Sequence, residues 1–363
     1  MINCHGGISE LKHRNKILYL QKYKMDSVAV RSTLYGEYYR THGYKVDYVY
    51  WDASPWDLFL MKWGPPIFQK LLSRVSQLFQ RIRQYWFLHW KVRFYDGIVI
   101  MKYFHYDTVR IIRKHTRAKL LYDFDDPIWL EMFGTQLEKY QQTLSCVDCV
   151  SVDNEYLYNH AKPFCREIFI FPPPAQFERL PEKKKETDSE ITLGWIGSGA
   201  SSYYLYSLYP VLEELGRRYH NIRLLVLGFP FPVLPFFENI RWEVIPAYDE
   251  KIMNLARRRI DIGLFPLFPC INSLGRGLCK PVIYMGAEIP VAATDYGLVS
   301  TIIRDEENGV LCNGQQEWVE KLSRLIEDRA WREKLGKAGF ETVKQFSLEN
   351  NFQLLEKHFL SRL

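Results

Sequence analysis

The chain has 363 residues, of which 47% are hydrophobic and 25% are charged, and its formal net charge is +6. This composition excludes a disordered chain, and the length is sufficient for two domains with separate cores. No apolar run reaches the roughly 18 residues of a membrane span, and the first residues lack the apolar stretch of a signal peptide, so we expect a cytoplasmic protein. Seven cysteines at irregular spacing predict reduced thiols and neither a disulfide framework nor a zinc site.

Short apolar strands alternate with helices through the first half of the chain. We predict strands at KILYLQ, YKVDYVYW, DGIVIMKY, AKLLYDF, CVSV and REIFIFPPP, and helices at about 28–42, at about 107–115 and after Asp126. This alternation predicts a mostly parallel, doubly wound sheet.

A basic and aromatic segment interrupts this series between Leu58 and Tyr95. It contains no acidic residue, several aromatic residues and seven basic ones, which are Lys62, Lys70, Arg74, Arg81, Arg83, Lys91 and Arg93. Its apolar residues recur at helical spacing after Pro65. Two interpretations remain open: a helix packed on the sheet with a solvated basic face, or a helix that lies on an anionic membrane surface. We expect no nucleic acid, because no recognised binding motif accompanies the charge.

The second half repeats the alternation after a stretch rich in proline and charge. We predict strands at ITLGWIG, IRLLVLG, IRWEVIP, DIGLFPL and IPVAAT, and helices at about 203–219, at about 250–258, up to Met285 and twice near the C-terminus. The expected organisation is an N-terminal domain at 1–172, a linker at 173–190, a second domain at 191–346 and a last helix at 347–363 that packs back on the first domain. Ligands of two such domains bind in the cleft at the carboxyl ends of the strands.

Two strand ends carry residues that could bind a ligand or a metal ion. The turn Gly197, Ser198, Gly199 to Ser201 joins a strand to a helix, so its N–H groups could bind a phosphate, although a plain tight turn has the same sequence. In YDFDDPIW, Asp126 before Pro127 is typical of a helix start. Asp123 and Asp125 would share one side of the strand end, as a metal-binding pair would.

The chain resembles a glycosyltransferase of family 4 with the GT-B architecture. LGWIGSGASSYYLYSLYPVLEEL, RRIDIGLFPL and RGLCKPVIYMGAEIPVAATDYGLVSTIIRDEENGVL are similar to the C-terminal half of that family, and KLLYDFDDPIW and CVSVDNEYLYNHA to the N-terminal half of a bacterial branch. The resemblance implies two Rossmann-like domains, a nucleotide-sugar donor in the second and a glycan or lipid-linked acceptor in the first. It further implies transfer with retention of configuration, without a metal or a cofactor, in the synthesis of surface polysaccharides or glycoconjugates.

One feature of the family is absent. Its two glutamates, eight positions apart, correspond to Gly275 and Ile283, while the branch keeps a basic pattern that matches Arg276 and Lys280 here. A departing nucleoside diphosphate needs preorganised positive charge. We therefore assign the distal phosphate to Arg276 and Lys280, four residues apart and neighbours if helical, and expect N–H donors from the turn Gly197–Ser201.

The acceptor side is expected in the first domain. The resemblance places YDFDD at the cleft, so Asp125 and Asp126 are assigned to acceptor contact or loop shaping, with Arg31 and Lys102 as further acceptor candidates. The absent glutamates leave a second class open, a catalytically inactive GT-B-shaped binding or scaffold subunit.

Overall fold

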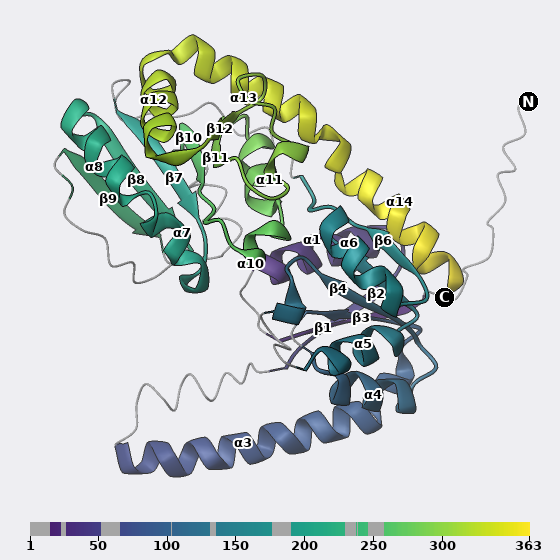
Figure 1. Ribbon diagram of the computed structural model, residues 1–363. Helices are drawn as coiled ribbons and strands as arrows, with labels where there is room; N and C mark the ends of the chain where they lie inside the picture. Colours follow the sequence, from purple (N-terminus) through teal and green to yellow (C-terminus); the bar gives the residue numbers. More distant parts are fainter. Residues whose placement is uncertain are drawn as a thin grey trace, which may run out of the picture.

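The computed structural model describes residues 15–22, 27–51, 66–102, 104–130, 136–175, 190–228, 237, 239–245 and 258–363. These residues form two α/β domains, each built on a six-stranded sheet whose neighbouring strands are all parallel (Figure 1). The predicted doubly wound fold class is thereby confirmed. Most strands are buried at all of their residues or at all but one, which is why they read as continuous apolar runs in the sequence.

The first sheet has the order β2-β1-β3-β4-β5-β6. Its strands are β1 (Lys16–Gln21), β2 (Lys45–Tyr50), β3 (Gly97–Met101), β4 (Lys119–Phe124), β5 (Cys149–Val152) and β6 (Ile168–Ile170). The helices of this domain are α1 (Ser27–Thr41), α3 (Pro66–His89), η1 (Lys91–Phe94), α4 (Tyr106–His115), α5 (Leu137–Ser145), α6 (Glu155–Ala161) and η3 (Lys162–Phe164). One face of the sheet packs on α3, α4, α5 and α6, and the other packs on α1.

The second sheet has the order β12-β11-β10-β7-β8-β9. Its strands are β7 (Ile191–Ile196), β8 (Ile222–Leu227), β9 (Ile240–Ile245), β10 (Ile262–Phe265), β11 (Val291–Thr294) and β12 (Val310–Cys312). Its helices are η4 (Gly199–Ser201), α7 (Ser202–Tyr206), α8 (Tyr209–Arg218), α10 (Ile271–Leu274), α11 (Cys279–Met285), η5 (Val299–Thr301), α12 (Gly314–Glu327) and α13 (Arg329–Val343). Counted from β7, this is the Rossmann strand order 3-2-1-4-5-6, with its switch point between β7 and β10. The helix predicted at about 250–258 lies almost wholly outside the described residues.

The C-terminal region forms three main helices where we predicted two. Asp328 caps α13 by accepting a hydrogen bond from the Trp331 N–H at 2.8 Å, and Ser347 caps α14 (Leu348–His358) by accepting one from the Asn350 N–H at 3.2 Å. These two caps divide the continuous helical pattern, because a cap residue satisfies N–H groups at a new helix start. The short η6 (Lys344–Phe346) and η7 (Leu360–Arg362) flank α14.

The last helix returns to the first domain, as Figure 1 shows in yellow. Phe352, Leu355 and Phe359 join the core on the α1 side of the first sheet. Within this contact the Asn351 side chain donates to the Tyr35 hydroxyl at 2.8 Å and to the Pro172 carbonyl at 3.1 Å. The chain therefore crosses between the two domains twice.

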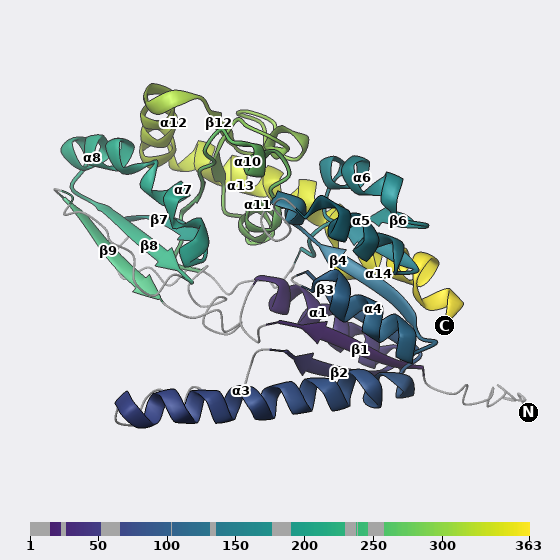
Figure 2. The same cartoon turned by 60° about the horizontal axis from the view of Figure 1, so that its bottom comes forward.

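Helix α3 lies along the outer side of the first domain, near the β2 edge of the sheet (Figure 2). It is 24 residues long, and its predicted amphipathic character is confirmed over the part whose side chains are described, from Leu78 onward. Lys62 and Trp63 lie outside the described residues. Within the described ranges, no helix is both long and apolar enough to cross a membrane.

Candidate functional site

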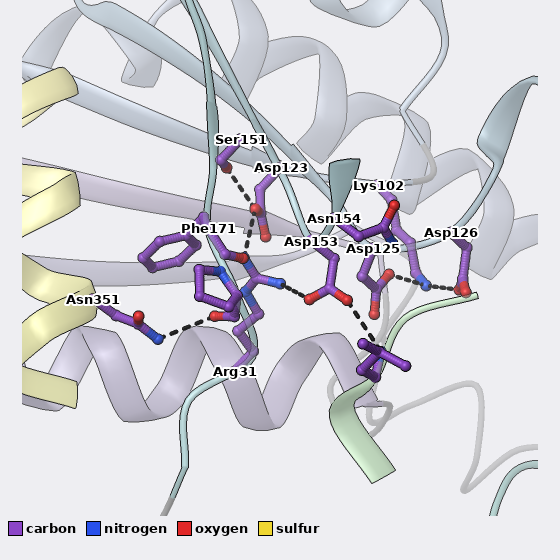
Figure 3. Close-up of polar contacts among 12 residues, drawn as sticks. Arg31, Lys102, Asp123, Asp125, Asp126, Ser151, Asp153, Asn154, Phe171 and Asn351 are labelled. Atoms are coloured by element: carbon purple, nitrogen blue, oxygen red, sulfur yellow. Dashed lines mark hydrogen bonds and ion pairs between the residues drawn. The ribbon is translucent and has the colours of Figure 1, made fainter. Parts of the chain in front are cut away.

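A row of carboxylates lies at the carboxyl ends of β4 and β5, on the side that faces the second domain (Figure 3). Asp123, Asp125 and Asp126 come from the end of β4, and Asp153 follows β5. Because the two strands pair in parallel with Asp123 opposite Ser151, these ends meet at one edge of the sheet. The edge borders the 275–280 segment of the second domain.

Arg31 holds two of these carboxylates from α1. Its guanidinium donates to Asp123 Oδ1 at 3.2 Å, to Asp153 Oδ1 at 3.4 Å and to the Phe171 carbonyl at 2.6 Å. Ser151 adds a hydrogen bond to Asp123 Oδ1 at 2.5 Å. The guanidinium also lies over the Phe171 ring, and the side chain is buried. The Arg31 guanidinium therefore donates its hydrogen bonds to groups of its own domain, whereas we expected it to contact the acceptor.

Lys102 holds the other two carboxylates. Its Nζ lies 2.5 Å from Asp125 Oδ1 and 2.5 Å from Asp126 Oδ2, and only 2% of its side chain is exposed. Lys102 is thus an internal counter-ion in this structure, and the acceptor contact expected of it stays a prediction. Asp123 pairs with Arg31, whereas Asp125 pairs with Lys102. The two carboxylates that we expected on one side of the strand end therefore do not share a cation. Within the described ranges, no group of three or more His, Cys, Asp or Glu side chains is arranged to hold a metal ion.

Asp126 connects the two domains. Besides Lys102, its carboxylate pairs with Arg276 of the second domain, with Nη1 and Oδ1 3.3 Å apart. Burial alone would raise the pKa of Asp126, but the charges of Arg276 and Lys102 hold it well below its usual range. Both carboxylate oxygens of Asp126 therefore pair with cations. The sequence led us to expect a helix cap at this residue and did not reveal these ion pairs.

Two further contacts fix the same segment of the second domain. Asp153 Oδ2 accepts a hydrogen bond from the Leu278 N–H at 3.1 Å, and the Asn154 amide donates to the Gly275 carbonyl at 3.3 Å. The other end of the Asn154 amide caps α6 by accepting from the Leu157 N–H. Burial raises the pKa of Asp153 to about 7, with the Arg31 charge offsetting part of that shift.

Gly275 occupies a tight position in this interface. A Cβ atom added there would lie 2.7 Å from Cδ1 of Tyr156 and 3.0 Å from Cγ of Pro127. The first distance is shorter than real Cβ contacts and the second is at their tight limit, so a glutamate does not fit while the domains hold this arrangement. The absent acidic side chain at this position therefore agrees with the packing of the two domains.

Arg276 and Lys280 lie close together at the edge of this interface. We expected Arg276 and Lys280 to be neighbours on one helix. Instead, Arg276 precedes α11 and Lys280 is the second residue of that helix. The Arg276 guanidinium lies 5.8 Å from the centre of the Tyr204 ring. Burial, together with the neighbouring Arg276 charge, lowers the pKa of Lys280 to about 8. Within the described part of the chain, Lys280 has no carboxylate at salt-bridge distance.

The turn from Gly197 to Ser201 uses several of its own N–H groups. Gly197 N–H donates to the Leu227 carbonyl at 3.0 Å, Ser198 N–H to Ser201 Oγ at 3.1 Å, and Ser201 N–H to the Ser198 carbonyl at 2.9 Å. The turn therefore offers fewer donors to a phosphate than its sequence suggests. Its connection to the site runs through α7, where the Tyr204 hydroxyl bonds to Ser273 Oγ at 2.8 Å.

Asp153 and Tyr204 are the residues of this site that the sequence did not identify. Asp153 stands at the end of a buried strand just before a helix cap, so the rule that ligands bind at the carboxyl ends of parallel strands could have identified it. Tyr204 gives no such signal, because its place beside Arg276 depends on how α7 and α10 pack.

No protein-family profile and no curated protein sequence matches the chain. Several solved structures share its fold. Sucrose-phosphate synthase from Thermosynechococcus elongatus is 14% identical, with a TM-score of 0.66 over 96% of this chain and 100% of that one. Anabaena HepE in complex with UDP-glucose is 14% identical, with a TM-score of 0.62 over the same shares. The lipopolysaccharide outer core galactosyltransferase WaaB, in its apo form, is 11% identical, with a TM-score of 0.61 over 96% and 100%. These neighbours confirm the GT-B architecture of two Rossmann-like domains.

Proposed function

We propose that the chain is a glycosyltransferase that moves a sugar from a nucleotide-sugar donor to an acceptor. The observation that carries this proposal is the pair Arg276 and Lys280, which lies where the second, Rossmann-ordered domain meets the first. Asp126 is an anion seated on Arg276, and Lys280 lacks a carboxylate partner among the described residues. A nucleoside diphosphate would complete the charge balance of this pair.

The chemistry follows from where charge develops. When the bond between the sugar and the distal phosphate breaks, its electrons remain on the diphosphate, and two nearby cations stabilise the added charge. Because these side chains provide the positive charge, we propose that transfer needs no metal. The donor phosphate takes the place of Asp126 beside Arg276, so that Asp126 keeps Lys102 as its partner.

Asp125 is our candidate for contact with the acceptor hydroxyl. Its side chain is 17% exposed, more than that of Asp126 at 10%, and Lys102 fixes its orientation. An ionised carboxylate accepts hydrogen bonds and would orient a sugar hydroxyl toward the donor. We propose retention of configuration on the strength of the resemblance to family 4.

The fold neighbours suggest where to begin the search for substrates. One of them is described with UDP-glucose and another as a galactosyltransferase of the lipopolysaccharide outer core. We propose a UDP-hexose as the first donor to test, and a glycan or lipid-linked acceptor in surface polysaccharide synthesis at the inner face of the cell membrane.

The direct test is to incubate the chain with UDP-, GDP-, ADP- and TDP-sugars and a panel of glycan and lipid-linked acceptors. Sugar-dependent release of nucleoside diphosphate, with a product whose anomeric configuration matches the donor by NMR, supports the proposal. Nucleotide binding without release from any donor would instead support the inactive binding subunit, which the closed position at Gly275 also allows.

A further inference from the structure

An apolar surface faces solvent on the second half of α3 and on the η1 turn. We call it the α3 face, and seven large side chains form it, each more than half exposed: Leu78, Phe79, Ile82, Tyr85, Trp86, Trp90 and Phe94. No other segment of the described chain gathers so many exposed large hydrophobic side chains. Such a cluster is unusual on a monomeric surface and marks a contact with another partner.

The α3 face lies opposite the side of α3 that packs on the domain. Phe87 and Leu88 enter the core, while Gln80 and Gln84 donate to the Trp51 carbonyl at 3.1 and 3.2 Å. At 100° per residue, the exposed apolar residues of the helix cover an arc of roughly 120° centred about 180° from this buried side. One side of the helix therefore packs on the domain, and the opposite side is apolar and exposed. The exposed apolar residues are not part of the domain core.

Basic side chains border the α3 face. On the same helical projection Arg81 lies beyond one edge of the apolar arc and Arg83 beyond the other, and both are exposed. Lys91 and Arg93 are also exposed, on the η1 turn. From residue 66 to residue 95 the sequence has no acidic residue. The complementary partner is therefore both apolar and anionic.

We propose that the α3 face docks the protein on an anionic lipid membrane. A convex helix with an apolar stripe, interfacial aromatic rings and flanking basic residues suits the boundary between headgroups and acyl chains. A second copy of the chain would bring two sets of arginines together with no acidic residue of α3 between them. Nucleic acid would match the arginines but leave the apolar stripe in water.

The direction of α3 relates this surface to the side on which the two domains meet. In both ribbon views the N-terminal part of α3 extends past the carboxyl ends of β1 and β2, toward the side on which the two domains meet (Figures 1 and 2). A membrane along α3 thus runs beside the edge of the sheet that carries the candidate site. A lipid-linked acceptor would reach Asp125 from that membrane; this consequence rests on the proposed function, whereas membrane docking does not.

Flotation with vesicles tests the docking. The wild-type chain is mixed with vesicles of phosphatidylglycerol and phosphatidylcholine, or of phosphatidylcholine alone, at low and high salt and without any sugar nucleotide. We expect binding to the anionic vesicles, weaker binding to the neutral ones and partial release by salt. Quenching of tryptophan fluorescence by brominated lipids should accompany binding, because Trp86 and Trp90 would enter the interface.

Matched variants separate the α3 face from general charge effects. The triple variant Arg81→Gln, Arg83→Gln and Arg93→Gln should lower the partition coefficient by roughly 100-fold, at about fivefold for each charge. The control variant Arg217→Gln, Arg304→Gln and Arg329→Gln removes the same charge from exposed positions of the second domain and should bind nearly as wild type. Phe79→Ser with Trp86→Ser should also abolish the binding that remains at high salt.

Two results would overturn the proposal: absence of wild-type binding to anionic vesicles, and equal loss of binding in the α3 and control triple variants. If vesicle binding is absent and sedimentation shows dimers that Phe79→Ser with Trp86→Ser converts to monomers, the α3 face is instead a contact between two copies of the chain. Unchanged melting temperatures in all variants establish that the fold is intact. Because the flotation assay contains no donor, its result is independent of the transfer assay. Vesicle binding together with no transfer in the donor and acceptor panel would refute the proposed function alone, and transfer without vesicle binding would refute the docking alone.

Discussion

Replacing Asp126 by asparagine should destabilise the free protein and strengthen its binding of nucleoside diphosphate. Asp126 and Arg276 carry unit charges 3.3 Å apart, which attract by about 5 kcal/mol at an effective dielectric constant of roughly 20. Lys102 is closer still, at 2.5 Å. Desolvation offsets part of this attraction, and loss of one member of a buried pair typically costs roughly 3–5 kcal/mol. Since asparagine keeps the shape and one oxygen, we expect about 3 kcal/mol.

The effect on ligand binding has the opposite sign. In the wild type a phosphate must displace Asp126 from Arg276, whereas in Asp126→Asn the guanidinium has lost that anionic partner before the ligand arrives. Urea unfolding measures the stability, and calorimetric titration with UDP, GDP, ADP and TDP measures the affinity. The control is Glu306→Gln, which breaks a half-exposed pair with Arg324 at 2.8 Å and should cost no more than about 1 kcal/mol. Equal stability of the two variants, or weaker diphosphate binding by Asp126→Asn, would refute the reasoning.

Four other predictions follow from the same geometry. In the protein without ligand, Lys280 loses its proton above about pH 8, so the affinity for nucleoside diphosphate should fall there by up to about tenfold per pH unit. A calorimetric pH series measures this fall, and Lys280→Arg should remove it. Between about pH 4 and pH 7 the folded state holds a proton on Asp153 that the unfolded state has lost, so the free energy of unfolding of the wild type should decline as pH rises. Urea unfolding should show a smaller decline for Asp153→Asn, which lacks this titrating group. Gly275→Ala should destabilise the protein by about 1–3 kcal/mol through its clash with Tyr156 and Pro127, which a melting curve would detect, and an unchanged melting temperature would contradict the close approach. Any transfer activity should survive EDTA; loss with EDTA and rescue by manganese would favour a metal site.

The sequence was sufficient for the fold because the determining signals are local. Strands buried on both faces appear as apolar runs, and the turn residues between them fix the alternation of strand and helix. Several features escaped this reasoning, among them the division of the predicted helix at about 203–219 into α7 and α8. β12 has only three residues, too few for a periodic pattern, and the division of the C-terminal helices depends on the single caps Asp328 and Ser347.

The candidate site was predictable only in part, because its partners come from different domains. The resemblance to family 4 pointed to Asp125 and Asp126 on the acceptor side and to the basic pair at 276 and 280 on the donor side. The sequence could not show that Arg31 is enclosed by Asp123 and Asp153, since these pairs join residues more than 90 positions apart. Nor could it show that the second domain places Arg276 on Asp126, which depends on domain packing and not on any local pattern.

The central claim is that Arg276 and Lys280 bind the donor diphosphate, and calorimetric titration of the best nucleoside diphosphate from the panel tests it most directly. Hydrogen bonds to charged groups contribute roughly 1.5–3 kcal/mol, so Arg276→Ala and Lys280→Ala should each weaken binding by roughly 10- to 100-fold. The control Arg304→Ala, an exposed residue of the same domain, should bind as the wild type does. Unchanged affinity in both site variants, with folds intact by circular dichroism, would contradict the account.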